Sequence, residues 1–166
     1  MSELSTWFDP TSKRAKAGIA FQNSVLEELL SMGVKAMSVP EWLKKLDSDL
    51  VDSQIWMLEK TWGDIVCLRK DGGKIFLECV TASSETTLFP TSKIWNFSGS
   101  NKWYAFGWDN NRHFVPSASW NSYVNKIEER VQREADVAVV VPRRYLSSMR
   151  SGVSGLKKFC DASGLI

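Results

Sequence analysis

Histidine is almost absent from this sequence, and that absence narrows the chemistry it can support. The 166 residues include a single histidine, His113. One histidine excludes a histidine-rich zinc site and argues against a Ser-His catalytic triad. Oxygen ligands remain, and they select hard ions such as magnesium or manganese.

Cysteines and long apolar runs are also scarce. Cys67, Cys79 and Cys160 are odd in number, and two of them fall in apolar segments that we expect to be buried strands. A disulfide framework is therefore not expected, which favours a reducing compartment. No apolar run approaches the roughly 20 residues that a membrane span needs, and residues 1–3 lack the pattern of a signal peptide. The sequence predicts a soluble, cytoplasmic protein with no membrane partner.

Charge is nearly balanced, so any affinity for nucleic acid must come from local clusters of basic residues. The net charge is only +2, too small to indicate a nucleic-acid partner by itself. Each basic cluster is open to two interpretations, ordinary solvated surface or phosphate contact. The clusters comprise Lys13, Arg14 and Lys16 near the start and Arg143, Arg144 and Arg150 near the end.

The length and the pattern of apolar residues predict one α/β domain over residues 17–166, preceded by a polar basic arm at residues 1–16. Apolar residues at helical spacing predict the clearest helix over residues 18–32, with Gly33 as its stop. We expect further helices at residues 41–50, 90–95, 120–133 and 156–160, strands at 65–68, 75–80, 102–108, 113–115 and 136–141, and a loop at 81–87.

The most informative feature is a predicted hairpin that carries two carboxylates, Asp64 and Glu78, beside apolar runs. A buried carboxylate without a partner is costly, and a metal ion is one possible partner. Glycines at residues 72–73 favour a tight turn. A three-residue loop at 71–73 would pair Asp64 with Val80 and leave Glu78 on the same face, about 7 Å away. A two-residue turn would instead put the carboxylates on opposite faces.

A helix, a hairpin with Asp and Glu, a crossing helix and further strands resemble the PD-(D/E)XK, or restriction-endonuclease-like, nuclease superfamily over roughly residues 17–141. The family's first helix typically begins with glycine, matched here by Gly18. Its metal-binding aspartate begins a strand, as Asp64 would. Its second acidic residue lies on the next strand, as Glu78 would. The resemblance implies a mixed β-sheet flanked by α-helices.

Two positions depart from the family pattern. The family has a glutamate on the first helix where this chain has Gln22, and a lysine two residues after the second acid where this chain has Val80. Some members of the family supply the lysine from a neighbouring element. Lys93, in the short helix after the hairpin, is the substitute that we expect here.

The resemblance implies a metal-dependent DNA endonuclease. Asp64, Glu78 and the Cys79 carbonyl would hold Mg²⁺ or Mn²⁺, Lys93 would stabilise charge near the attacking water, and Gln22 would bind a metal-bound water. Such ions polarise the phosphate and activate water. The basic residues Lys13, Arg14, Lys16, Arg143 and Arg144 would contact the DNA backbone. A homodimer is a further expectation that follows from relatives of this fold.

Other interpretations of the same residues stay open. Asp64 could simply cap a turn, and Glu78 could pair with Lys93 without any metal. A nuclease-like module that binds nucleic acid or protein without catalysis is therefore the main alternative, favoured by the departures at Gln22 and Val80. A carbohydrate-binding protein that uses Trp103 and Trp108 is a third possibility, but it leaves both hairpin carboxylates unexplained.

Overall fold

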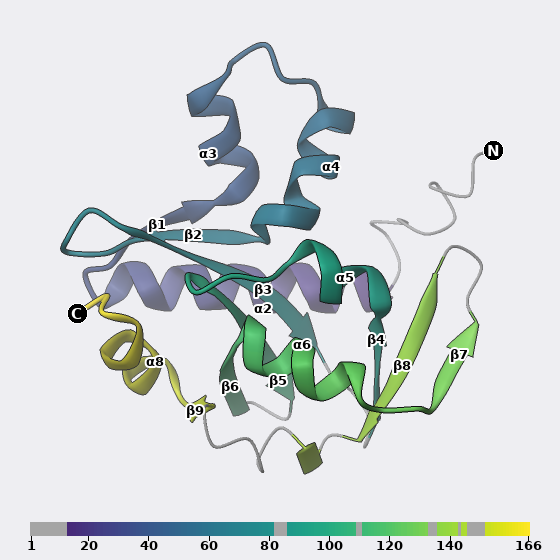
Figure 1. Ribbon diagram of the computed structural model, residues 1–166. Helices are drawn as coiled ribbons and strands as arrows, with labels where there is room; N and C mark the ends of the chain where they lie inside the picture. The colour runs from purple at the N-terminus through teal and green to yellow at the C-terminus, as the bar shows by residue number, and fades with distance from the viewer. Residues whose placement is uncertain (1–12, 82–85, 109–110, 133–135, 143, 146–151) are drawn as a thin grey trace.

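The computed structural model describes residues 13–81, 86–108, 111–132, 136–142, 144–145 and 152–166. These residues form a mixed α/β fold (Figure 1). The helices are α2 (Lys13–Ser31), α3 (Val39–Leu46), α4 (Asp52–Trp62), α5 (Thr91–Asn96), α6 (Ser117–Asn125) and α8 (Leu156–Ser163). The strands are β1 (Lys35–Ser38), β2 (Ile65–Leu68), β3 (Lys74–Thr81), β4 (Thr86–Pro90), β5 (Lys102–Trp108), β6 (Asn111–Pro116), β7 (Arg130–Gln132), β8 (Val137–Pro142) and β9 (Val153–Ser154).

A mixed sheet is the centre of the described chain. Its order is β1-β2-β3-β5-β6-β9, and every neighbouring pair is antiparallel except β3 and β5, which run parallel. The parallel pair requires a crossover, and β4 and α5 lie within it. A smaller antiparallel sheet has the order β4-β8-β7. The crossover therefore joins the two sheets and carries α5 across the larger one.

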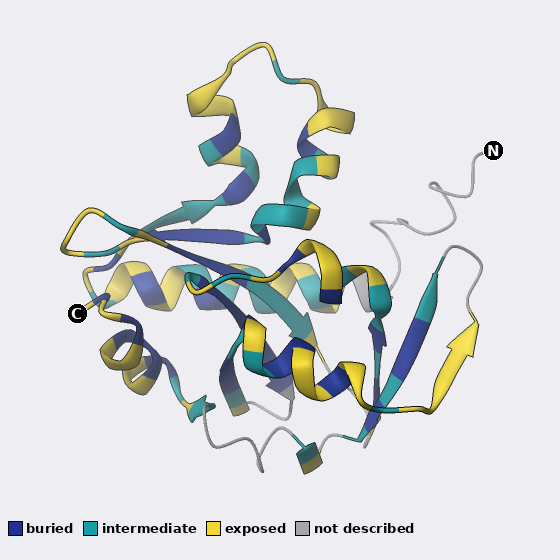
Figure 2. Cartoon of the chain, in the orientation of Figure 1, coloured by how far each residue is buried: buried dark blue, intermediate teal, exposed yellow. Residues whose placement is uncertain are grey.

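Helices cover both faces of the large sheet (Figure 1). Helices α2 and α8 pack on one face, where Val25, Leu29 and Phe159 meet Ile75 and Leu77 of β3. Helices α3 to α6 and the smaller sheet cover the other face. Side chains of a strand alternate between faces, so β3 supplies both cores. The strands between the helices are the most buried part of the chain (Figure 2).

The mixed sheet flanked by helices confirms the predicted α/β class. Helix α2 confirms the predicted first helix, and Gly33 ends it with a φ of 84°. The helix nevertheless begins at Lys13, so residues 13–16 of the expected arm are helical, because Lys, Arg and Ala favour helix and no glycine or proline lies between Lys13 and Gly18. The rest of that arm, residues 1–12, lies outside the described residues.

Three predicted segments were wrong in part. The expected helix 120–133 is shorter, because α6 ends at Asn125 and the chain then forms β7, which pairs with β8. Ile127 and Val131 continue the helical spacing, but pairing with a strand competes with it. Thr86 and Thr87, placed in a loop, belong to β4. The expected helix 41–50 ends at Leu46, and the following helix α4 and the short strand β1 were not predicted.

The hairpin turn also differs from the prediction. The register pairs Ile65 with Leu77 and Leu68 with Lys74, and the Arg69 N–H donates to the Gly73 carbonyl. The loop is therefore residues 70–72, one position earlier than the 71–73 that we expected. The paired register ends at Ile65 and Leu77. Asp64, directly before it, bonds to Leu77 and Cys79 of β3, so the expected pairing of Asp64 with Val80 is wrong.

Two findings concern the cysteines and the membrane. Cys67, Cys79 and Cys160 are free thiols, and Cys67 and Cys160 are buried. Within the part of the chain that the structure describes, no helix combines the length and the apolar character that crossing a membrane requires.

Candidate active site

Gly63 sets the position of Asp64. It ends α4 with a φ of 83°, and a Cβ at this residue would lie 2.7 Å from the Leu77 carbonyl oxygen and 2.9 Å from the Phe97 ring. Only glycine permits both that backbone conformation and that close approach. The following Asp64 N–H donates to the Leu77 carbonyl at 2.7 Å. The last turn of α4 thus delivers Asp64 directly against β3.

The Asp64 carboxylate lies beside the backbone of β3. Its Oδ2 accepts a hydrogen bond from the Cys79 N–H at 2.8 Å. Burial raises the pKa of Asp64 well above its ordinary value, the negative charge of Glu78 raises it further, and the Cys79 hydrogen bond lowers it only in part. Cys79 therefore contacts Asp64 through its N–H, whereas the sequence had assigned a role to its carbonyl.

Glu78 lies on the same face of β3 as Phe76, which is the face covered by α4 and α5. Its Oε1 accepts a hydrogen bond from Lys93 Nζ at 3.0 Å, and the two side chains are 13% and 31% exposed respectively. Burial alone would lower the pKa of Lys93, but the carboxylates of Glu78 and Asp64 outweigh it and raise that pKa. Lys93 is therefore a fixed cation between the helix and two carboxylates.

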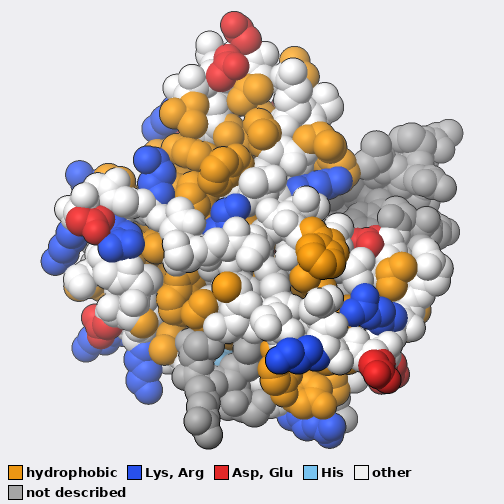
Figure 3. Space-filling view, in the orientation of Figure 1, with side chains coloured by type: hydrophobic (Ala, Val, Ile, Leu, Met, Phe, Trp, Pro, Cys, Tyr) orange, Lys and Arg blue, Asp and Glu red, His pale blue; other side chains and the backbone are white. Residues whose placement is uncertain are grey.

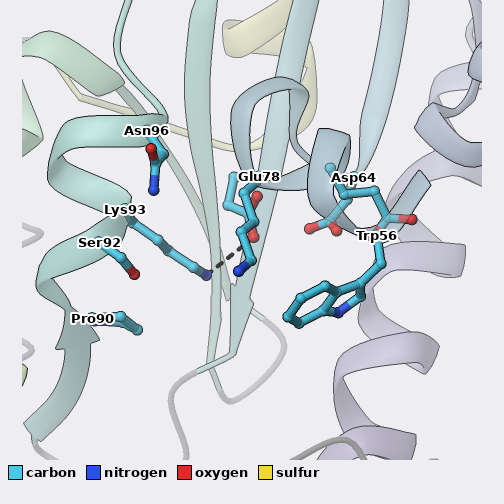
Figure 4. A pocket seen from close by; sticks show the side chains of 9 residues that line it. Trp56, Asp64, Glu78, Pro90, Ser92, Lys93 and Asn96 are labelled. Atoms are coloured by element: carbon cyan, nitrogen blue, oxygen red, sulfur yellow. Dashed lines mark hydrogen bonds and ion pairs between the residues drawn. The ribbon is translucent and has the colours of Figure 1, made fainter. Parts of the chain in front are cut away.

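These three side chains share a cavity of about 180 Å³ between α4 and α5 (Figure 4). Glu78 lies in the middle of the view, with Asp64 and Trp56 on one side and Ser92, Lys93 and Asn96 of α5 on the other. The lining residues are Trp56, Glu59, Lys60, Asp64, Glu78, Pro90, Ser92, Lys93 and Asn96.

Asp136 fixes the first turn of α5 from outside the cavity. Its carboxylate accepts hydrogen bonds from Thr91 Oγ1 at 3.0 Å and from Ser92 Oγ at 2.7 Å. Burial acts to raise the pKa of Asp136, but these hydrogen bonds outweigh burial and lower it. Asp136, directly before β8 of the smaller sheet, thereby holds the helical turn from which Lys93 extends to Glu78.

Sequence reasoning missed Glu59, which adds a carboxylate to the cavity from α4. Burial and the charge of Glu78 raise the pKa of Glu59 from 4.5 to about 7. Recognising α4 would have revealed it, since Glu59 lies about one helical turn before Gly63. The same helix supplies Trp56 and Lys60, which sequence reasoning also missed.

The remaining predicted site residues lie elsewhere or outside the described chain. Gln22 is half-buried on α2, on the opposite face of the sheet from Lys93, and does not line the cavity. Lys13 and Arg14 belong to the start of α2, and Lys16 is exposed there. Arg144 is exposed, with its guanidinium 5.4 Å from the Tyr145 ring centre. Arg143 and Arg150 lie outside the described residues.

Asp64 and Glu78 are two oxygen donors of the cavity that could hold a hard divalent ion. Burial and the charge of Glu78 raise the pKa of Asp64, and a bound cation would relieve the repulsion between the two carboxylates. Among the described residues, no three Asp, Glu, His or Cys side chains are grouped closely enough to hold a metal ion. An ion here would therefore take its other ligands from water and from a substrate phosphate, which is usual for Mg²⁺.

Comparison with known proteins gives no independent guide to the chemistry. No model of a protein family matches the chain, and no curated protein matches it. The assignment below therefore depends on the residues of this cavity and on the order of the elements around it.

Proposed function

We propose that this protein is a metal-dependent DNA endonuclease of the PD-(D/E)XK type. The observation that carries the proposal is the convergence of Asp64, Glu78 and Lys93 in one cavity. They come from the entry to β2, from β3 and from α5. The element order of α2, the β2–β3 hairpin, α5 and β5 supports the restriction-endonuclease-like fold, although α3 and α4 are added between β1 and β2.

The proposed reaction gives a role to charged side chains of the cavity. Asp64 and Glu78 hold Mg²⁺ or Mn²⁺, which when bound polarises the phosphate and lowers the pKa of a water molecule. Lys93 stabilises negative charge that develops on the phosphate, in place of the lysine that Val80 replaces. Glu59, with a pKa of about 7, is the carboxyl group best suited to exchange a proton at neutral pH.

The Lys93 ion pair also favours the second candidate, a nuclease-like module that binds nucleic acid or protein without catalysis. Lys93 already satisfies Glu78 at 3.0 Å, and such a pair needs no metal. Binding by this module would be independent of magnesium. DNA hydrolysis that requires a divalent ion separates the two candidates.

Cleavage of plasmid and single-stranded DNA with Mg²⁺ or Mn²⁺, with and without chelator, tests the proposal. The parent is compared with Asp64→Asn and with Asp49→Asn, which makes the same change at an exposed residue of the α3–α4 connection. We expect cleavage in the parent and in Asp49→Asn, and its loss in Asp64→Asn and in chelator. DNA that is bound but never cut would instead establish the non-catalytic module.

Lys93→Met and Lys93→Arg examine the cation in the same assay. Methionine keeps most of the side-chain volume but removes the charge, so we expect turnover to fall by about 10- to 100-fold. Arginine keeps the charge and should restore part of that loss. Turnover unaffected by Lys93→Met would exclude a catalytic role for Lys93 and leave it as the ion-pair partner of Glu78.

A further inference from the structure

Trp56 is an aromatic side chain inside the wall of the candidate active site. It lines the cavity together with Asp64 and Glu78, and Figure 4 shows its indole beside both carboxylates. Trp56 also lines the open groove between α3 and α4, so it borders both the cavity and the groove, as does Glu59. Trp56 is only half-buried. A large apolar ring so close to charged oxygens is unusual for simple core packing.

Two other tryptophans of this region, Trp42 and Trp62, pack against the sheet instead of lining the cavity. Trp42 and Trp62 pack against Phe76 with ring centres 5.4 and 5.0 Å from it, which anchors α3 and α4 to the sheet. Within the described chain Trp56 makes no such ring contact, although it lies on the same helix as Trp62. Anchoring of α4 is thus accounted for without Trp56.

A cation accompanies the Trp56 ring. Lys60 Nζ lies 4.1 Å from the centre of the ring, within the range of a cation–π contact. Lys60 is exposed and also lines the cavity. Figure 3 shows Lys and Arg side chains scattered over one face of the molecule and hydrophobic side chains gathered over α3 and α4. The cavity therefore combines an aromatic surface, two cations and three carboxylates within one small space.

We propose that Trp56 stacks on an unpaired nucleobase next to the phosphate that a divalent ion held by Asp64 and Glu78 would bind, and that Lys60 contacts a neighbouring phosphate. This inference rests on the proposed nuclease function and specifies its substrate as single-stranded or locally unpaired DNA. A base inside a duplex has both faces covered by its neighbours, so it must leave the stack to reach a ring inside a cavity. Aromatic rings with nearby cations are the common platform for single strands.

The test compares one labelled oligothymidylate as a single strand and as a duplex with its complement, using the parent, Trp56→Leu and Trp56→Phe. Trp95→Leu is the matched control, because Trp95 is 74% exposed on α5 but does not line the cavity. Cleavage gives KM and kcat separately, and fluorescence anisotropy in Ca²⁺ gives binding of the same DNA without relying on turnover.

We expect the parent to prefer the single strand. Trp56→Leu should raise the KM and the Kd for the single strand by about 5- to 100-fold and change kcat little. Trp56→Phe, which keeps a ring and guards against a folding defect, should recover much of the loss, and Trp95→Leu should resemble the parent. A preference for duplex, unchanged single-strand affinity in Trp56→Leu, or an equal loss in Trp95→Leu would overturn the inference.

The two proposals can fail separately. If the parent cuts DNA but Trp56→Leu binds single strands as tightly as the parent, only the stacking inference is wrong. If the parent cuts no DNA, the nuclease proposal is wrong, and the anisotropy measurement alone decides whether Trp56 binds unpaired bases. Loss of single-strand binding in Trp56→Leu would then support a binding module that uses the same cavity.

Discussion

The two faces of the large sheet show how one strand can serve a core and a site. On the face covered by α2 and α8, Ile75 and Leu77 of β3 pack with Val25 and Leu29 in an apolar core. On the other face, Phe76 is buried in the same way, but two residues later Glu78 meets Lys93 instead of an apolar side chain. The face under α2 and α8 is packed with apolar side chains that stabilise the fold. On the other face, the Glu78–Lys93 ion pair takes the place of some apolar packing.

The difference arises from the covering helices. Helix α2 lies along the sheet and supplies apolar residues throughout, whereas α4 and α5 leave a cavity between them. The charged side chains Glu78 and Lys93 are tolerated beside that cavity because they form an ion pair and because both remain partly exposed to solvent. Substitutions on the two faces should therefore affect different properties.

The largest expected effect is on catalysis, from Glu78→Gln. This variant removes a proposed metal ligand, so we expect cleavage to fall by at least about 100-fold. The free energy of unfolding should fall by less than the roughly 3–5 kcal/mol that breaking a buried ion pair costs, because Lys93 keeps Asp64 as a nearby negative charge and the repulsion of Glu78 with Asp64 and Glu59 disappears. Cleavage rates and urea denaturation measure the two quantities. A fully active variant would remove Glu78 from the mechanism.

Leu29→Ala should give the opposite result. Leu29 is a fully buried residue of α2, so the cavity left by truncation should lower the free energy of unfolding by about 2–5 kcal/mol. Turnover per folded molecule should stay close to that of the parent, because Leu29 does not line the active-site cavity. Urea denaturation at a temperature where the variant remains folded is the measurement. Lost turnover in a folded variant would mean that the two faces are coupled.

A smaller effect is expected for Glu59→Gln, and it depends on pH. The pKa of Glu59 rises from 4.5 to about 7 on folding, so the unfolded chain ionises first and stability falls as pH rises between those values. Because Glu59 is part-exposed, its replacement should stabilise the protein by only about 1 kcal/mol at pH 8, and not at pH 4. Urea denaturation in chelator at both pH values measures this. A gain at pH 4 equal to that at pH 8 would contradict the assignment.

The smallest effect is expected for Gln22→Ala. Gln22 lies on the α2 face and does not line the cavity, so both kcat and KM should stay within about twofold of the parent. The family resemblance instead assigns this position to the metal site. Kinetics at limiting Mg²⁺ decide whether Gln22 belongs to the metal site. If it does, its removal should raise the Mg²⁺ concentration needed for half-maximal activity.

The sequence was informative about the strands and about the charged residues of the hairpin. Apolar runs predicted β2 and β3, and Asp64 and Glu78 stood out because carboxylates beside buried strands need partners. The turn was displaced by one residue, since Gly72 and Gly73 favour several neighbouring loops equally well. Asp64 therefore bonds to Leu77 and Cys79 of β3 instead of pairing with Val80.

The α4 wall of the cavity could not be found in the same way. Helix α4 begins after Val51, whose side chain cannot make the usual cap. Its residues Ile55, Leu58 and Trp62 do recur at helical spacing, but the preceding residues 47–51 gave no sharp boundary. Without that helix, Trp56 and Glu59 could not be assigned to a site that other elements define.

Titration with Mn²⁺ tests the central claim most directly, because it examines the carboxylate pair without any assumption about substrate. Calorimetry at pH 7 compares the parent with Glu78→Gln and with the control Asp49→Asn. The account predicts saturable binding in the parent and in Asp49→Asn, proton release from the carboxyl groups whose pKa is raised, and loss of binding in Glu78→Gln. A parent that binds no Mn²⁺, or binds it equally well without Glu78, would contradict the account.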